Sequence, residues 1–265
     1  MISVILPVNR DDGFLEQAVN SILNQTYSSF ELLIIANNCN NELWDKIQLI
    51  RKKDIRIQAH RLNLGGLVFA LNYGLNIAKY EYIARMDADD IALSNRFKLQ
   101  IDFLEKNPEI VILGTQIAYI DELNKERPIK ASFLPVGSKD LCKISYLKCP
   151  LYHPTVMFRK TPIMKIGAYK YGFYGEDYEL WLRCMHEGYN IANLEEILLK
   201  YRIHSSQLSN SSDRKNIYIH QMIGIFNKIY KEPKYLITMI INKSFTQKLI
   251  VKTTRFRKFL YGLLK

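Results

Sequence analysis

An acidic cluster follows a run of apolar residues in the first half of the chain. Residues 80–86 are predicted to form a buried strand that leads directly into Asp87, Asp89 and the adjoining Asp90. On an extended backbone, side chains two residues apart point to the same side, so Asp87 and Asp89 can face one ligand. Carboxylate oxygens suit Mg²⁺ or Mn²⁺ shared with the phosphates of a nucleotide. The alternative interpretation is a solvated acidic turn in which Asp90 or Ser94 caps the next helix.

A second acidic pair, Glu176 and Asp177, begins a predicted helix over residues 176–187. A helix N-terminus favours ionised carboxylates, which suits a general base, and Asp177 is the residue we predict for that role. Neighbours on a helix diverge by about 100°, which predicts different roles for the two acids, one facing a substrate and the other capping or orienting. Trp181 falls on the face of Asp177 and could stack against the ring of a ligand. The alternative is that the acids only stabilise the helix and Trp181 lies in the core.

The elements that must position these acids alternate in type along the first half of the chain. Apolar runs separated by amphipathic segments predict parallel strands joined by crossover helices, hence an α/β fold with a central, mostly parallel sheet flanked by helices. Such a sheet binds ligands at the carboxyl ends of its strands, where the acidic cluster lies. We expect strands at 2–8, 30–36, 55–60, 80–86 and 110–119, and helices at 13–25, 42–52, 66–78 and 95–105.

The second half is less regular. Short elements fill residues 135–162, and residues 191–203 are predicted to form a pair of strands or an extended segment. A polar, serine-rich stretch at 205–216 marks a domain boundary. We therefore expect a catalytic domain over residues 1–209 and a basic, helical extension over residues 210–265.

The formal net charge of +11 is concentrated in this extension. Residues 215–265 carry eleven basic residues and one acid, which leaves the rest of the chain close to neutral. Residues 243–265 combine an apolar helical stripe with seven basic residues, as in helices that lie on anionic membrane surfaces. The alternative is a helix that packs on the protein body. No arrangement of aromatic and basic residues typical of nucleic-acid binding is identifiable there, so we expect no nucleic-acid partner.

Composition places the chain among globular proteins, with 48% hydrophobic and 24% charged residues. Four cysteines without CxxC spacing predict a reduced, cytosolic compartment rather than a disulfide scaffold. No apolar run approaches the length of about 18–20 residues that a membrane span needs, and the first residues are predicted to form a strand rather than a signal peptide.

Several motifs in sequence order resemble those of the family 2 glycosyltransferases, which have the GT-A fold. The resemblance covers about residues 1–209. The motifs are SVILPVN at 3–9, SILNQT at 21–26, FELLII at 30–35, RLNLGG at 61–66, RMDADD at 85–90, HPT at 153–155, GEDYELW at 175–181 and YRIH at 201–204. One departure is that Asn37 and Asn38 stand where the family usually has an acidic pair, so the choice of nucleotide base is open.

The resemblance implies an inverting transfer of a hexose, most simply galactose or glucose, from a nucleotide-diphosphate sugar, UDP by expectation. The implied acceptor is a polyprenyl-diphosphate-linked saccharide of bacterial O-antigen or capsule synthesis, and the implied location is the cytoplasmic face of the cell membrane. Mn²⁺ or Mg²⁺ is the implied cofactor. The implied site residues are Asp177 and Glu176 for catalysis; Pro7, Asn9, Asn37, Asn63, Gly65, Arg85 and Asp87 for the donor; Asp89, Asp87 and His204 for the metal; and His153 and Trp181 for the acceptor.

Two alternatives remain at this point. A structural histidine explains His204 and His153 as well as a binding role does. A non-catalytic, membrane-associated scaffold that retains the fold is the alternative function, against which the intact acidic motifs count.

Overall fold

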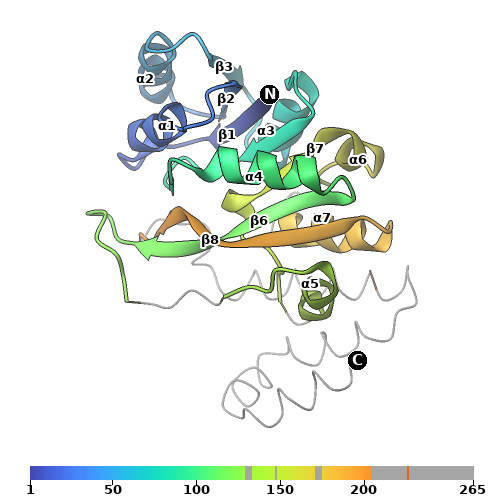
Figure 1. Cartoon of the computed structure of the whole chain (residues 1–265). Coiled ribbons are helices and arrows are strands. Elements are labelled where there is room, and N and C mark those ends of the chain that lie inside the picture. Colours follow the sequence, from blue (N-terminus) through green and yellow to red (C-terminus); the bar gives the residue numbers. More distant parts are fainter. Residues whose placement is uncertain (129–132, 147, 171–174, 205–225, 227–265) are drawn as a thin grey trace, which may run out of the picture.

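The computed structural model describes residues 1–128, 133–146, 148–170, 175–204 and 226. Eight strands form one sheet in the order β3-β2-β1-β4-β7-β6-β8-β5, with helices on both sides (Figure 1). This arrangement confirms the predicted α/β architecture with helices flanking a central sheet.

The N-terminal half of the sheet is parallel and built from the predicted elements. Strands β1 (Ile2–Val8), β2 (Phe30–Asn37), β3 (Ile57–Leu62) and β4 (Tyr82–Arg85) pair side by side in parallel. Every residue of β1 and β2 is buried, as expected for strands covered on both faces. Because the strands are parallel, the loops that follow β1, β2, β3 and β4 gather at one edge of the sheet.

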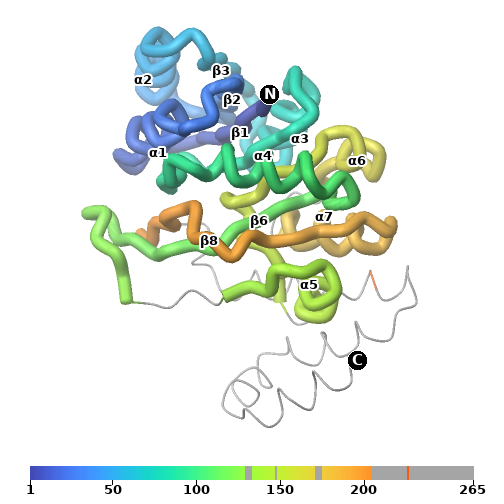
Figure 2. The backbone as a smooth tube through the Cα atoms, in the orientation of Figure 1, coloured from blue at the N-terminus to red at the C-terminus, as the bar shows by residue number. Residues whose placement is uncertain are grey.

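The C-terminal half of the sheet is mixed rather than parallel. The short strand β7 (Met157–Arg159) lies antiparallel between β4 and β6 (Ile110–Ile120), and β6 then pairs in parallel with β8 (Asn190–Arg202). Figure 2 shows β6 and β8 running beside each other across the molecule. The two-residue β5 (Ile91–Ala92) is antiparallel to β8 at the end of the sheet. Residues 191–202 thus belong to one long strand, which is the extended alternative of the prediction rather than the strand pair.

Two apolar layers hold the helices on the sheet. On one face, alternate residues of β1 pack with α1 (Leu15–Leu23), α2 (Asn41–Arg51) and α4 (Arg96–Lys106). The opposite face packs with α3 (Leu67–Ile77), α5 (Ser138–Ser145), α6 (Lys160–Lys165) and α7 (Glu176–His186). A 3₁₀ turn, His153–Thr155, precedes β7. Together these layers fix the loops that carry the two acidic motifs.

The close approach of α3 to the sheet depends on Gly74. A Cβ built on Gly74 lies 2.7 Å from Cγ2 of Ile5, a β-branched residue in the central strand. We expect Gly74→Ala to lower the free energy of unfolding by about 1–3 kcal/mol, because the overlap exceeds what a packed core can absorb. Urea denaturation measures the change, with Gly137→Ala as the control because a Cβ there meets no atom within 4 Å. Equal stability of Gly74→Ala and the unmodified protein would contradict this packing.

The remaining sequence predictions concern cysteines, membrane spans and the basic extension. All four cysteines are free, as their spacing predicts. Among the residues described, the structure contains no helix both long and apolar enough to cross a membrane. The predicted extension over 210–265 and its stripe at 243–265 lie outside the described residues, except for Phe226. That side chain is buried, and its ring lies 6.1 Å from the ring of His186 in α7.

Candidate active site

The three aspartates after β4 converge as predicted for a cation site. Carboxylate oxygens of Asp87, Asp89 and Asp90 lie within 4.8 Å of one another. Asp90 is buried, and its Oδ2 has no hydrogen-bond partner among the described residues. Burial and the carboxylates of Asp89 and Asp87 raise the pKa of Asp90 well above its ordinary value. A buried carboxylate oxygen without a partner, beside two further carboxylates, is the hard oxygen donor set that Mg²⁺ or Mn²⁺ prefers.

The end of β8 holds this acidic loop in place. The backbone N–H of Arg202 donates to Asp90 Oδ1 at 2.9 Å, and its Nε donates to the carbonyl oxygen of Asp89 at 2.7 Å. The other end of the guanidinium reaches Gln17 of α1 at 2.7 Å. Arg202 is absent from the site predicted from the sequence, although it is the second residue of the YRIH motif. Its contacts with Asp89 and Asp90 join residues that lie more than one hundred positions apart in the sequence.

His204 lies against the same loop. Its Nε2 is 2.9 Å from Asp89 Oδ2, and its Nδ1 is 3.9 Å from a carboxylate oxygen of Asp12. The predicted metal residues Asp87, Asp89 and His204 are therefore brought together. His204 contacts Asp89 in this structure, and its role as a metal ligand stays a prediction.

Arg85 differs from its predicted role. Its terminal nitrogens form a two-point contact with the Asp87 carboxylate, at 2.6 Å on each side. The side chain is 3% exposed, so it does not present its charge to an incoming phosphate in this structure. Instead Arg85 fixes the orientation of Asp87, and burial of a charge is stabilised by such a bidentate partner.

The second acidic motif forms its own cluster at the start of α7. Asp177, Glu176 and His153 bring their side-chain ligand atoms within 4.8 Å of one another. Burial and the neighbouring Glu176 carboxylate raise the pKa of Asp177, against smaller opposing effects of His153 and Arg85. The Sγ of Cys149 lies 3.7 Å from Asp177 Oδ2. Asp177 and Glu176 thus lie in one neighbourhood. That one faces a substrate while the other orients stays a prediction.

Trp181 requires a correction. The prediction that its ring supports an acceptor sugar is wrong for this structure, because Trp181 is fully buried and packs edge-on against the His153 ring with centroids 5.8 Å apart. Its position four residues after Asp177 places it on the inner face of α7, in the apolar layer under the sheet. Trp181 packs against the ring of His153 and does not contact a ligand.

The residues predicted to bind the donor lie on loops that meet at the ends of β1, β2 and β3. The side chain of Asn37 joins these loops: its Nδ2 donates to the carbonyl oxygen of Val8 at 3.2 Å, and its Oδ1 accepts from the N–H of Gly66 at 3.1 Å. Asn9, Asn63 and Gly65 are exposed on this surface, whereas Pro7 is buried within β1. Donor contact by these residues stays a prediction, and Asn37 already uses both ends of its amide to hold the loops.

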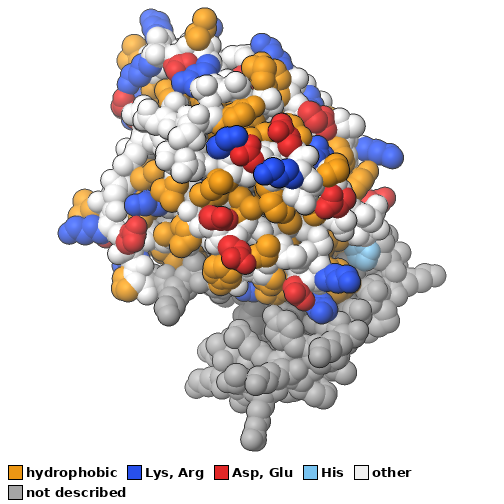
Figure 3. Space-filling model, viewed as in Figure 1, with side chains coloured by type: hydrophobic (Ala, Val, Ile, Leu, Met, Phe, Trp, Pro, Cys, Tyr) orange, Lys and Arg blue, Asp and Glu red, His pale blue; other side chains and the backbone are white. Residues whose placement is uncertain are grey.

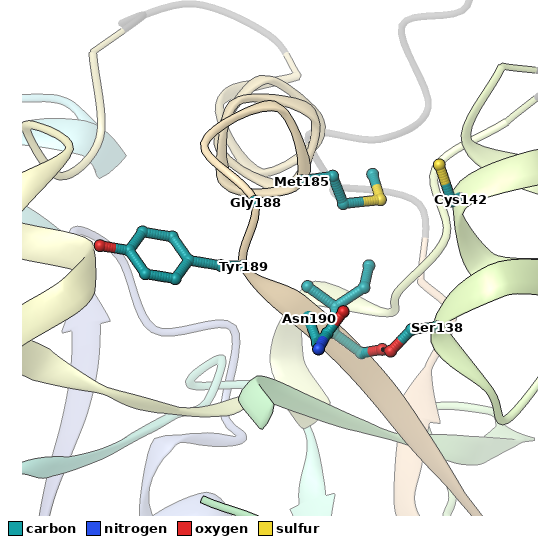
Figure 4. Close-up of a pocket in the computed structure, with 7 residues that line it drawn as sticks. Ser138, Cys142, Met185, Gly188, Tyr189 and Asn190 are labelled. Atoms are coloured by element: carbon teal, nitrogen blue, oxygen red, sulfur yellow. Dashed lines mark hydrogen bonds between the residues drawn. The ribbon is translucent and has the colours of Figure 1, made fainter. Parts of the chain in front are cut away.

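A small pocket lies apart from both clusters. Its volume is about 160 Å³, and it opens between α5 and the turn from α7 into β8, near Cys142, Met185 and Tyr189 (Figure 4). None of the predicted site residues lines it. The face of the molecule in Figure 3 shows basic and acidic side chains interspersed among apolar ones, without a large area of one charge.

The chain belongs to the family described as glycosyl transferase family 2, whose sequence pattern it matches over residues 3–167. Both the fold and the family agree with the resemblance noted in the sequence.

The relatives include glycosyltransferases of O-antigen and amylovoran biosynthesis. The chain is 43% identical over 215 residues to the O-antigen biosynthesis glycosyltransferase WbnJ of Escherichia coli, covering 80% of this chain and 83% of WbnJ. It is 32% identical over 208 residues to the UDP-Gal:alpha-D-GlcNAc-diphosphoundecaprenol beta-1,3-galactosyltransferase of Escherichia coli, covering 76% of this chain and 73% of that enzyme.

Solved structures share the fold at low sequence identity. S. aureus TarS in complex with UDP-GlcNAc superposes with a TM-score of 0.72 at 15% identity, covering 99% of this chain and 79% of TarS. The mannosyltransferase PcManGT from Pyrobaculum calidifontis, in complex with GDP-Man and Mn²⁺, superposes with a TM-score of 0.70 at 12% identity, covering 92% of this chain and 69% of PcManGT.

Proposed function

We propose that this glycosyltransferase transfers galactose or glucose from the corresponding UDP-sugar to a polyprenyl-diphosphate-linked saccharide of O-antigen or capsule synthesis. The transfer proceeds with inversion at the anomeric carbon. The observation that carries the proposal is the pairing of two acidic clusters, one at the end of β4 and one at the start of α7. The relative that uses UDP-Gal and a GlcNAc-diphosphoundecaprenol supports the choice of donor and acceptor.

In the proposed reaction, the hydroxyl oxygen of the acceptor bonds to the anomeric carbon while Asp177 accepts the proton of that hydroxyl. The bond between that carbon and the diphosphate oxygen breaks, and the leaving UDP keeps the electron pair. The raised pKa of Asp177 suits a general base, since a more basic carboxylate takes a proton more readily. Attack opposite the leaving group gives inversion.

The residues fit a divalent cation at the first cluster. Asp89 and Asp87 would hold it, with Asp90 and His204 alongside, on the grounds of the converging oxygens and the partnerless Asp90 Oδ2. When bound, Mn²⁺ or Mg²⁺ supplies positive charge that neutralises the diphosphate leaving group. Arg85 contributes by fixing the Asp87 carboxylate through contacts to both of its oxygens.

A thermal-shift screen tests donor choice and cation dependence together. We expect UDP-galactose or UDP-glucose to raise Tm only when Mn²⁺ or Mg²⁺ is present, because ligand binding to the folded state stabilises it by mass action. GDP- and ADP-sugars at the same concentration are the controls. An equal shift with every nucleotide, or the same shift after chelation, would contradict the proposed donor site.

We also propose that residues 243–265 hold the enzyme on the inner face of the cell membrane through their basic charge and apolar stripe. Vesicle flotation tests this: binding is expected to phosphatidylglycerol-containing vesicles, to weaken as salt rises, and to be lost when the basic residues of 243–265 are replaced by glutamine. Equal flotation with uncharged vesicles would contradict an electrostatic anchor.

A further inference from the structure

A chain of buried polar contacts runs behind the second acidic cluster. Tyr169 is 3% exposed, and its hydroxyl oxygen lies 2.9 Å from Nε2 of His153. The other ring nitrogen of His153, Nδ1, lies 3.6 Å from Oε1 of Glu176. The phenol, the imidazole and the carboxylate are thus in series, and they end at the first turn of α7.

The loop that presents Tyr169 is held from both sides. The side chain of Asn72 in α3 forms two hydrogen bonds with the backbone of Tyr169. Asn72 Oδ1 accepts from the N–H of Tyr169 at 3.1 Å, and Asn72 Nδ2 donates to the carbonyl oxygen of Tyr169 at 2.8 Å. From α7, the guanidinium of Arg183 donates to the carbonyls of Ile166 and Ala168, both at 2.6 Å. Ala168 adopts a positive φ of 49°, a conformation that a non-glycine residue keeps only where its surroundings enforce it.

The neighbours of His153 select its protonation state. Burial, together with the positive charge of Arg85, lowers the pKa of the imidazole to about 3, so the ring is neutral at physiological pH. A neutral imidazole carries one N–H, and a lone pair on Nδ1 would face the Glu176 carboxylate unfavourably. This favours the tautomer with the hydrogen on Nδ1, which faces Glu176 across 3.6 Å, and in that tautomer Nε2 accepts from the Tyr169 hydroxyl.

We propose that His153 and Tyr169 are positioning residues: Tyr169 fixes the His153 tautomer, and His153 Nδ1–H holds Glu176 so that the adjoining Asp177 is aligned for proton transfer. This inference rests on the proposed function, in which Asp177 is the base. This positioning role takes the place of the predicted contact between His153 and the acceptor, because the His153 ring is buried between Tyr169, Trp181 and Glu176.

Two replacements of His153 separate positioning from packing. An asparagine amide can place a donor near the position of Nδ1, whereas a glutamine amide reaches toward that of Nε2. We expect His153→Asn to retain most of the kcat and His153→Gln to lose about tenfold or more, with the donor KM unchanged in both, because misplacing a catalytic group lowers the chemical step rather than binding. Tyr169→Phe is expected to lower kcat less than His153→Gln does.

Melting temperature and UDP binding are measured on each variant, so that loss of folding is recognised. Equal losses in His153→Asn and His153→Gln, or no loss in His153→Gln and Tyr169→Phe, would overturn the inference. Loss of transfer in these variants while Asp177→Asn stays fully active would contradict the proposed base instead, so the two failures are distinguishable.

A spectroscopic readout does not depend on activity. In long-range ¹H–¹⁵N NMR spectra of the protein labelled at histidine nitrogens, the His153 signals are those missing from His153→Asn. We expect a neutral ring with Nδ1–H between about pH 5 and 9, despite the nearby Glu176, Asp177 and Asp87 carboxylates, because burial and Arg85 oppose protonation. An Nε2–H tautomer, or titration near the ordinary histidine pKa, would overturn the inference.

Discussion

Replacing Asp177 with asparagine is expected to lower kcat for sugar transfer by about 10²–10⁴-fold, the usual contribution of a general base. The melting temperature is expected to stay the same or to rise. The folded-state pKa of Asp177 is raised, mainly by burial and by Glu176, so ionisation of this carboxyl costs stability as the pH rises above its unfolded-state pKa. Asparagine has a similar shape and no charge, and it removes that cost.

Steady-state kinetics and thermal unfolding on the same samples measure both effects. Glu176→Gln is the matched control, because it removes the neighbouring charge and leaves the proposed base; its expected loss is smaller. The raised pKa also predicts that transfer by the unmodified enzyme declines on the acid side at a higher pH than an ordinary aspartate would give. Undiminished transfer by Asp177→Asn would contradict the assignment of the base.

Replacing Asp89 with asparagine is the second large effect expected. Asp89 belongs to the converging carboxylates and accepts from His204, and asparagine keeps an oxygen for that contact while removing the charge. We expect transfer to fall by about 10²–10³-fold, the range seen when one electrostatic contact to a developing charge is lost. Titration calorimetry of Mn²⁺ with UDP is expected to show weaker binding as well.

Asp102→Asn is the control for this variant. Asp102 lies on the surface of α4 and pairs with Lys98, so the same chemical change there is expected to leave transfer and Mn²⁺ binding unaltered. Equal Mn²⁺ affinity in Asp89→Asn and the unmodified protein would contradict the placement of the cation.

The sequence predicts β1 and β2 well, because each is a nearly continuous apolar run, whereas the more polar β3 lies at 57–62 rather than at the predicted 55–60. Strands β1 and β2 are buried throughout, and burial on both faces produces that pattern. The short strands β5 and β7 have two and three residues, too few for any periodicity to be visible. Strand β8 has Glu195 and Glu196 in its middle, which interrupts the apolar pattern and makes one strand resemble two.

The acidic residues of the site are predictable from their types and spacing, but their supports are not. Arg202, Tyr169 and Asn72 act through hydrogen bonds to residues far away in the sequence. Nothing in the local pattern marks such contacts, since they depend on how the sheet and helices pack. The same limit explains Trp181, whose spacing from Asp177 fits either a ligand face or the core, and whose burial decides for the core.

The most direct test of the account is the anomeric configuration and cation dependence of the product. The full-length protein is incubated with UDP-galactose or UDP-glucose and a synthetic polyprenyl-diphosphate-linked GlcNAc, with Mn²⁺ or with a chelator, and the product is analysed by ¹H NMR. We expect a β-linked hexose that forms only when the divalent cation is present. An α-linked product, or equal turnover in the presence of the chelator, would contradict it.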